Sequence, residues 1–594
     1  MKITDLLKKQ RKSEEILALL KGYIQTHPIE KMADLKAAAI LKLLGFTSCR
    51  TAKSSTSIEY SEGQRYLKQA ISKNPKDSDT YATLAGTYKR LGNHDMAHEL
   101  YRKALEVDPG DPYPLGNFLV YEILRQGYKL TMEKYGDYIE RAIEKRSNQA
   151  EVLVDTPWVF FDLGTYHLLK GDIYKSLNNY LLAIKYSGDI VEIKTTIDTI
   201  TRLEMEAEHI KGLDFACVLL MLGIAHQPKP QKPEDIAIWN SVRTKLDSKM
   251  QHMYHYDHHE KNVIMAGVTK KQEPVVYKVM RDRFLNVFNG FKGTIISGGT
   301  RAGICEIAGD IKEKYPSNIK VVGYHPANIP ANTSCDTRYD KLVQTRGTEF
   351  SVLEPLQYWY DLIKSEVNPA EIKLIGYNGG PISALEFRMA IVFGAQTGIV
   401  GDSGRAATEL VQNAKRWIEV PRAEGKSKQR AFKIMKNNVD EIRNFLTRPF
   451  VTDADVENLY RVSIHKVVDG SCLYEFSFAP FDTPADLFAG YMTALDSLGD
   501  EFKLGNIYGI KFRNGFLSGG YLSDLKLKVI FLLHDPPSIS LERKMSEFII
   551  NTERVLGTQL HAAADTNHIY YHNPDIEKIY EAVFGKEIKK FFPK

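Results

Sequence analysis

A repeated spacing of small residues and prolines in the first third of the chain constrains the fold more strongly than any other feature. Three pairs of such residues are separated by about 34 positions: Gly63 and Ala97, Ala70 and Ala104, and Pro75 and Pro109. A period of this length is typical of stacked helical hairpins, because small residues let two helices approach closely and a proline ends the second helix. We therefore expect residues 1–245 to form an α-solenoid.

One repeat is complete enough to be assigned to helices. Residues 79–108 predict a first helix, a turn at Gly92-Asn93 and a second helix that ends before Pro109. This segment resembles the tetratricopeptide repeat, and a weaker copy of its pattern follows at residues 160–183. The resemblance implies a concave surface that binds protein partners. A spacer, or an arm for self-association, is the alternative role of such an array.

The composition limits the classes of protein to which the chain can belong. A length of 594 residues is too great for one core and indicates about three or four domains. No 18-residue apolar stretch predicts a membrane span, and a net charge of +5 without a basic stripe argues against nucleic-acid binding. The five cysteines have no paired spacing, which favours a reducing cytoplasm over disulfides or a zinc site.

A histidine-rich segment lies between the repeats and the next domain: His252, His255, Asp257, His258 and His259. His255 and His259 would lie one turn apart on a helix, a spacing that metal ions can use. A strand is predicted directly afterwards at residues 262–266, however, and this disfavours a helix. We therefore prefer a polar linker to a metal site and expect no bound metal.

From residue 258 the pattern changes to alternating strands and helices. This alternation predicts a doubly wound parallel sheet of the Rossmann-like class over residues 258–425. The predicted strands are: residues 262–266, 293–297, 319–324, 340–345, 371–376 and 397–400. Amphipathic segments between the strands predict the covering helices: residues 275–288, 304–315, 350–364 and 382–393.

Glycine-rich loops follow four of these strands at the edge where doubly wound sheets bind ligands. The loops are: Gly267-Val-Thr269, Gly298-Gly-Thr300, Gly379-Gly380 and Gly401-Asp-Ser-Gly-Arg405. Glycines let the backbone approach a phosphate, and the N–H groups of the next helix attract anions. Arg301 and Arg405 are candidates for phosphate contacts, while Glu354 and Asp402 are candidates for a ribose hydroxyl or for helix capping.

Three segments carry a family resemblance: Ser297-Gly-Gly-Thr-Arg-Ala-Gly303, Gly376-Tyr-Asn-Gly-Gly-Pro381 and Asp402-Ser-Gly-Arg405. They resemble the SLOG superfamily, especially the branch at the cytoplasmic N-terminus of melastatin-type TRP channels, over roughly residues 260–415. The resemblance implies a sensor domain for nucleotide-derived ligands such as ADP-ribose and its cyclic relatives. By this resemblance the following residues line the ligand: Gly298, Gly299, Thr300, Gly379, Gly380, Ser403, Gly404 and Arg405. Further candidates at the same edge are: Gly267, Arg301, Ser383 and Asp402.

A second branch of the superfamily is catalytic. The Lonely Guy phosphoribohydrolases carry the motif Gly-Gly-x-Gly-Thr-x-x-Glu, which aligns with residues 379–386 and places Glu386 on the catalytic carboxylate. Ile382 replaces a glycine of that motif, and its Cβ would crowd a phosphate; Ser383 replaces the threonine. We therefore favour ligand binding over hydrolysis of an N-glycosidic or phosphoribosyl bond. A scaffold with a vestigial site is a third reading.

The C-terminal part predicts a smaller α+β domain. We expect residues 426–450 to form a basic connecting helix, and residues 451–594 show the order β-β-α-β-β-α. The predicted elements are: strands at residues 460–466, 472–478, 507–512 and 527–533, and helices at residues 487–498 and 541–556. This order resembles longin or roadblock domains, which implies dimerisation or docking of partner proteins. We therefore expect a cytoplasmic homo-oligomer that binds proteins and a nucleotide-derived molecule, without a membrane, nucleic acid or resident cofactor.

Overall fold

The structure is a computed structural model, and it describes most of the chain. The described residues are: 13–251, 254–259, 261–269, 273–418, 431–448, 453–478, 509–512, 515–522, 527–566 and 573–592. The chain divides into two compact units, Met1–Met253 and Tyr254–Lys594. No helix within the described ranges is long and apolar enough to cross a membrane.

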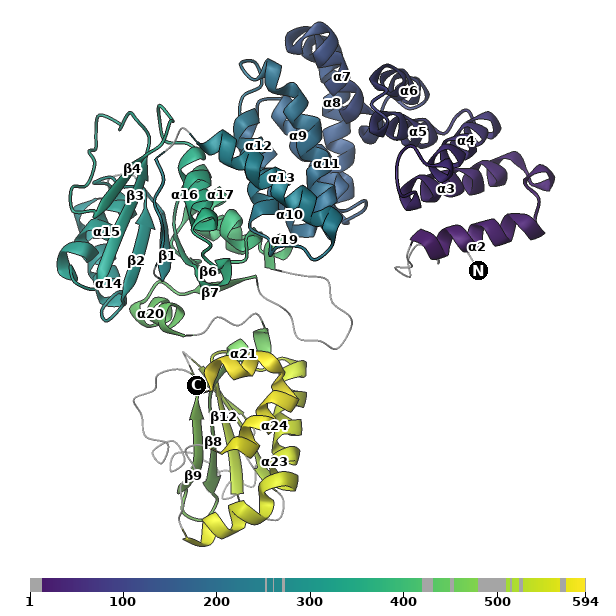
Figure 1. Cartoon of the computed structure of the whole chain (residues 1–594). Helices are drawn as coiled ribbons and strands as arrows, with labels where there is room; N and C mark the ends of the chain where they lie inside the picture. The colour runs from purple at the N-terminus through teal and green to yellow at the C-terminus, as the bar shows by residue number, and fades with distance from the viewer. Residues whose placement is uncertain are drawn as a thin grey trace. The chain divides into compact units, whose positions relative to one another are not determined.

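The first unit is an array of helices, as the repeat spacing predicts (Figure 1). Its α-helices are: α2 (Ser13–Thr26), α3 (Asp34–Thr51), α4 (Ile58–Lys73), α5 (Ser78–Arg90), α6 (His94–Val107), α7 (Pro112–Gln126), α8 (Tyr128–Glu151), α9 (Trp158–Leu169), α10 (Ile173–Tyr186), α11 (Ile190–Ile200), α12 (Leu213–Ala225) and α13 (Pro233–Met250). The side chain of Asn93 accepts a hydrogen bond from the N–H of Met96 and so caps α6. The pair α5 and α6 confirms the helical hairpin predicted at residues 79–108.

Glycine is required where two pairs of these helices cross. A Cβ on Gly164 of α9 would lie 2.5 Å from the ring of Tyr180 on α10. A Cβ on Gly63 of α4 would lie 2.4 Å from Sγ of Cys49 on α3. Real Cβ atoms do not approach other atoms so closely, so these helix pairs depend on the absence of a side chain.

The second unit contains a parallel sheet with the strand order β4-β3-β2-β1-β5-β6-β7. Its strands are: β1 (Asn262–Gly267), β2 (Gly293–Ser297), β3 (Ile319–His325), β4 (Lys341–Gln344), β5 (Lys373–Tyr377), β6 (Gln396–Val400) and β7 (Phe432–Met435). The helices between them are: α14 (Pro274–Val287), α15 (Gly303–Lys314), α16 (Leu353–Lys364), α17 (Pro381–Val392), α18 (Arg405–Gln412) and α19 (Lys415–Ile418). Helix α20 (Val439–Thr447) follows β7. Every residue of β1 and β2 is buried, as expected when helices cover both faces of a parallel sheet.

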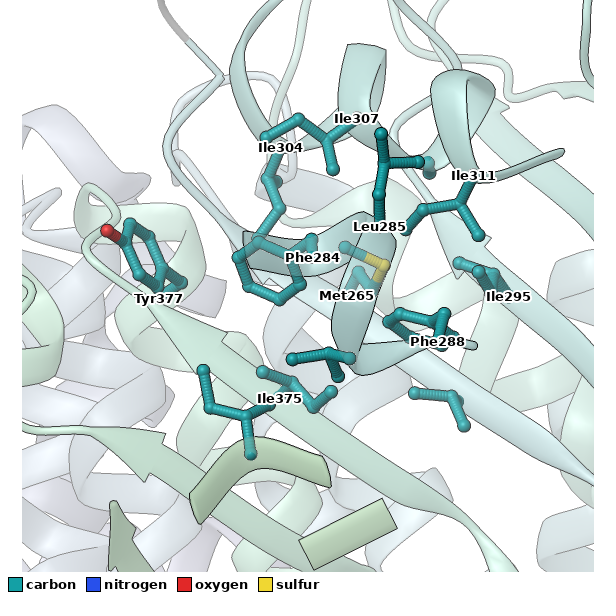
Figure 2. Close-up of a cluster of buried hydrophobic side chains, with 14 of the residues drawn as sticks. Met265, Phe284, Leu285, Phe288, Ile295, Ile304, Ile307, Ile311, Ile375 and Tyr377 are labelled. Atoms are coloured by element: carbon teal, nitrogen blue, oxygen red, sulfur yellow. The ribbon is translucent and has the colours of Figure 1, made fainter. Parts of the chain in front are cut away.

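One core of this unit lies where α14 and α15 cover the sheet (Figure 2). Phe284 projects from α14, Phe288 follows directly after that helix, and Ile304, Ile307 and Ile311 project from α15. These side chains pack against Met265 of β1, Ile295 of β2 and Ile375 of β5. The packing fixes both the strand ends and the first turn of α15, which together frame the candidate site.

The connecting helix predicted over residues 426–450 is wrong at residues 432–435, which form a strand, whereas residues 439–447 are helical. Phe432 and Met435 are buried in strand β7, which pairs in parallel with β6 as the edge strand of the sheet. A shorter helix, α20, follows, and the side chain of Asn438 caps it by accepting from the N–H of Glu441. The basic side chains of this segment favoured a helix in the prediction. The short strand forms because it pairs with β6, which is distant in sequence.

A second sheet is antiparallel and has the order β10-β11-β12-β8-β9. Its strands are: β8 (Leu459–Lys466), β9 (Cys472–Ser477), β10 (Gly509–Phe512), β11 (Gly515–Leu522) and β12 (Leu527–Leu533). Helices α21 (Ala454–Asn458), α23 (Ile539–Thr566) and α24 (Pro574–Phe584) complete this part. Strand β11 was not predicted, and the helix predicted at residues 487–498 lies outside the described residues.

Candidate ligand-binding site

The order of the parallel sheet creates a switch point between β1 and β5. From β1 the chain adds β2, β3 and β4 on one side, and later adds β5, β6 and β7 on the other. Gly267 ends β1 directly beside Tyr377, which ends β5. A Cβ on Gly267 would lie 2.0 Å from the carbonyl oxygen of Tyr377. Crevices at such switch points are where doubly wound sheets bind ligands.

The loop after β5 is held in a conformation that favours glycine. Asn378 has a φ of 57° and Gly379 a φ of 99°. A Cβ on Gly379 would lie 2.6 Å from Cβ of Ser383 on α17. The hydroxyl of Ser383 donates a hydrogen bond of 3.0 Å to the carbonyl of Gly267. The loops after β1 and β5 are therefore locked together at the start of α17.

The start of α17 presents backbone donors that the protein does not use. Within the described part of the chain, the N–H groups of Gly379, Gly380, Ile382 and Ser383 donate to no protein acceptor, and no side chain caps the helix. Pro381 has no N–H to offer. Successive N–H groups at a helix N-terminus form a site that attracts anions.

The loop after β6 brings Arg405 to the same place. A nitrogen of the Arg405 guanidinium lies 3.5 Å from the position that a Cβ on Gly380 would occupy. Arg405 is exposed, has a φ of 43°, and pairs with no acidic side chain among the described residues. The hydroxyl of Ser403 accepts from the N–H of Asn378 at 2.7 Å and fixes this loop to the end of β5.

The first turn of α18 is not itself available to an anion. The N–H of Ala406 donates to the carbonyl of Gly379, and the N–H of Ala407 donates to the carbonyl of Asn378. These bonds are 3.4 and 3.1 Å long. They occupy the N–H groups after the glycine-rich loop that were expected to bind an anion. The start of α17 is therefore the stronger candidate.

The loop after β2 is held by a neighbouring segment. Gly299 has a φ of 73°, and Thr300 forms an antiparallel bridge with Cys335. The side chain of Arg301 donates to the hydroxyl of Thr337 at 3.3 Å and lies 3.7 Å from the carboxylate of Asp336. Arg301, expected to contact a phosphate, thus already has protein partners.

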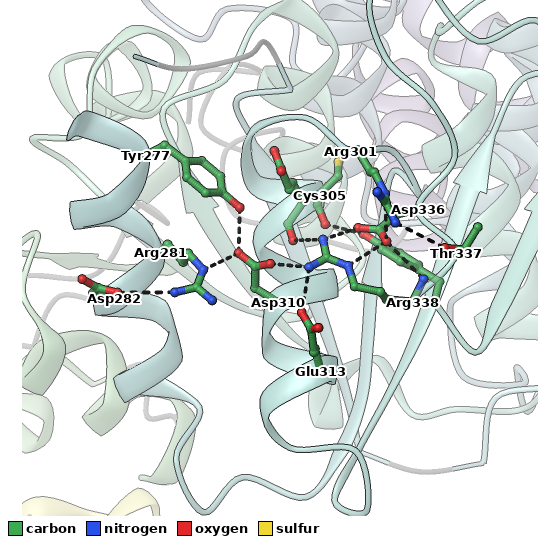
Figure 3. A network of polar contacts seen from close by, with 12 residues as sticks. Tyr277, Arg281, Asp282, Arg301, Cys305, Asp310, Glu313, Asp336, Thr337 and Arg338 are labelled. Carbon is green, nitrogen blue, oxygen red and sulfur yellow. Dashed lines mark hydrogen bonds and ion pairs between the residues drawn. The ribbon is translucent and has the colours of Figure 1, made fainter. Parts of the chain in front are cut away.

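A network around Arg338 holds that segment against α15 (Figure 3). Arg338 donates to both carboxylate oxygens of Asp336, at 2.9 and 2.6 Å, and also contacts Asp310 of α15. Tyr277 and Arg281 of α14 donate to Asp310, each at 2.7 Å. Charge-assisted bonds of this kind are strong and directional, so they stabilise the loop after β2.

Glu386 lies one turn beyond Ser383 on α17. Burial raises the pKa of its carboxyl to about 7, against the opposing effect of hydrogen bonds with Tyr358 and Ser383. The hydroxyl of Tyr358 donates to its Oε1 at 3.3 Å. A carboxyl group with a pKa near neutrality can act as a general acid or base.

The other acidic candidates differ in their surroundings. Glu354 is buried and accepts from the hydroxyl of Thr345 at 2.6 Å and from the N–H of Ser351 at 2.8 Å, so its carboxyl group already has protein partners. Asp402 is exposed in the loop before Arg405. Asn378 was not predicted as a site residue, although its left-handed backbone lies where the loops after β5 and β6 are hydrogen-bonded to each other. Its place between a strand and a double glycine was the available signal.

The described part of the histidine-rich segment, residues 254–259, packs against the parallel-sheet part. His255 Nδ1 lies 2.9 Å from Asp361, and His258 lies within hydrogen-bond distance of Asn262 and Tyr324. Burial lowers the pKa of His258 to about 4, so its ring is neutral at physiological pH. The described residues contain no group of three or more potential ligands that could hold a metal ion.

Comparisons with known proteins identify the repeats. Residues 59–115 match the tetratricopeptide repeat family. The human protein O-mannosyl-transferase TMTC1 is 20% identical over 201 residues, which cover 34% of this chain and 20% of that protein. The match thus spans about a fifth of the length of the relative. The chain contains tetratricopeptide repeats.

Two solved structures are similar to parts of the chain. The structural genomics target TM1055 has 18% identity and a TM-score of 0.21, with 30% of this chain and 95% of that chain covered. A mutant O-GlcNAc transferase from Thermobaculum terrenum has 11% identity and a TM-score of 0.14, with 61% of this chain and 50% of that chain covered.

Proposed function

We propose that this protein is a sensor and adaptor. Its parallel-sheet part binds a nucleotide-derived anion at the carboxyl ends of β1, β5 and β6, and its repeats bind a protein partner. By resemblance to the SLOG superfamily, the ligand class is ADP-ribose and related molecules. The C-terminal sheet, which we propose to be longin- or roadblock-like, would dock partners or a second copy in the cytoplasm.

The observation that supports this proposal is that unused donors and a cation lie close together. The N–H groups at the start of α17 have no protein acceptor among the described residues, and a guanidinium nitrogen of Arg405 lies 3.5 Å from the position that a Cβ on Gly380 would occupy. A phosphate or diphosphate would satisfy both, because its oxygens accept several hydrogen bonds and its charge matches the arginine and the helix dipole. Gly380 has no side chain, so the backbone there remains open to close approach.

Thermal unfolding of the full chain tests the proposal. The panel would contain ADP-ribose, cyclic ADP-ribose, NAD, AMP and a cyclic dinucleotide. A ligand that binds only the folded state, at about 100 times its Kd, stabilises that state by about 2.7 kcal/mol. We expect stabilisation by at least one member of the panel. If none of them changes the unfolding temperature, the proposal fails and a scaffold role through the repeats is favoured.

The second candidate function is hydrolysis of an N-glycosidic or phosphoribosyl bond. The raised pKa of Glu386 and its hydrogen bond from Tyr358 favour it, because a carboxyl group poised near neutrality can donate or accept a proton. The Glu386→Gln variant separates the two functions. Under the enzyme hypothesis it would retain ligand binding and lose turnover, whereas an unchanged ligand after prolonged incubation with the wild-type protein would exclude hydrolysis.

A further inference from the structure

A cysteine and a histidine meet at the β3 side of the same sheet edge. His325 is the last residue of β3 and is buried, with 8% of its surface exposed. Cys335 lies in the loop between β3 and β4 and is partly exposed. Its Sγ is 4.0 Å from Nε2 of His325. Neither residue contributes to the ligand site described above.

The surroundings of His325 determine which ring nitrogen faces the thiol. Nδ1 lies 2.8 Å from the carbonyl oxygen of Pro326. A carbonyl oxygen can only accept a hydrogen bond, so in the neutral ring Nδ1 carries the proton. Nε2 is then left with a lone pair directed to Cys335. This is the arrangement in which an imidazole accepts a proton from a thiol.

The backbone on both sides of Cys335 is fixed. The N–H of Asp336 donates to the carbonyl of Gly299 at 2.9 Å, and the N–H of Arg301 donates to the carbonyl of Ser334 at 2.9 Å. The backbone of Cys335 therefore cannot move away from His325 without breaking the bridge to Thr300. The other cysteines, which serve as internal comparators, are all buried: Cys49, Cys217, Cys305 and Cys472.

We propose that Cys335 is a nucleophilic thiol, assisted by His325, and a site of covalent modification by small electrophiles, including hydroperoxides. With a hydroperoxide, the sulfur attacks the outer oxygen, an S–O bond forms and the O–O bond breaks. Cysteine is oxidised to sulfenic acid, and the hydroperoxide is reduced to an alcohol or water. The thiol proton passes to Nε2 of His325 and then to the leaving oxygen.

Alkylation of the full chain by iodoacetamide, followed by mass spectrometry of its peptides, tests this assignment. The sulfur displaces iodide and forms an S–C bond, so the mass of each cysteine peptide reports its reaction. We expect Cys335 to react at least about tenfold faster than each of the buried cysteines. The His325→Asn variant is the matched control, because its amide can still donate to Pro326 but offers no base.

We expect His325→Asn to slow the alkylation of Cys335 at neutral pH by at least about fivefold, because an unassisted thiol is only a few per cent ionised there. Added imidazole should restore part of the rate in His325→Ala, which a merely structural role of the ring would not allow. Unfolding temperatures of the variants report whether they are folded. Equal rates for Cys335 in the wild-type and folded His325→Asn proteins would overturn the proposal, as would labelling of the buried cysteines at the rate of Cys335.

Discussion

The carboxyl group of Glu386 shows how a single side chain can link the candidate site to stability. Its pKa of about 7 in the folded protein exceeds the value of about 4.3 expected for an unfolded chain. The folded state therefore binds this proton more tightly. The resulting contribution to stability is full at pH values below the unfolded pKa, and it is lost as the pH rises through the folded pKa.

We predict that Glu386→Gln makes the protein more stable than the wild type by up to about 3–4 kcal/mol at about pH 8, because the variant has no carboxyl group to ionise. At about pH 4.5 the two proteins should differ little, since the carboxyl is then neutral. Urea unfolding at both pH values measures this. A stability difference that does not change with pH would contradict the raised pKa.

The partners of individual side chains distinguish two arginines that are equivalent candidates for a phosphate contact in the sequence. Arg301 and Arg405 both follow glycine-rich loops, but Arg301 contacts Asp336 and Thr337, whereas Arg405 reaches over Gly380. Asp336 lies far from Arg301 along the chain, so no local pattern could have revealed that contact. The strand ends that carry the site were predictable, because periodicity and glycine position them locally.

Among the helices and strands, some could be predicted from local sequence alone, and others form only through long-range pairing. The hairpin of α5 and α6 was predicted closely because its turn, cap and apolar faces all lie within one repeat. Strands β7 and β11 were missed, since four residues at a sheet edge, or a glycine-rich strand, become strands only by pairing with β6 or β12. The helix crossings in the repeats depend both on a glycine in the local sequence and on the side chain that packs against it from the neighbouring helix.

We predict opposite effects for two glycine-to-alanine substitutions in these helices. Gly164→Ala should destabilise the protein by about 1–3 kcal/mol, because the new methyl group would overlap the ring of Tyr180. Gly136→Ala, in α8, should stabilise it by about 0.5–1 kcal/mol, because no atom lies within 4 Å of the added Cβ and alanine favours a helix. Denaturant unfolding of both variants measures the difference; destabilisation of similar size in both would refute the crossing argument.

At the scale of the whole molecule, the chain consists of two compact units that can be studied apart. The helical unit carries the tetratricopeptide repeats, and the second unit carries both sheets. Each has its own buried core, which is the condition for folding alone. In the function proposed above, the helical unit would bind a partner and the second unit would bind the ligand.

We predict that residues 1–253 and residues 254–594 each fold when expressed separately. Far-ultraviolet circular dichroism of the two fragments should sum to the spectrum of the full chain, and each fragment should unfold cooperatively. Only the fragment of residues 254–594 should be stabilised by a ligand that stabilises the full chain. Ligand stabilisation of the helical fragment would place the binding site elsewhere.

Isothermal titration of ADP-ribose into the wild-type, Arg405→Ala and Arg301→Ala proteins tests the proposed ligand site most directly. We predict binding to the wild type and to Arg301→Ala with similar Kd values. We predict a Kd at least about tenfold higher for Arg405→Ala, which loses a charge-assisted hydrogen bond worth about 1.5–3 kcal/mol. No binding to the wild type, or equal binding by wild type and Arg405→Ala, would contradict the placement of a nucleotide-derived anion at the start of α17.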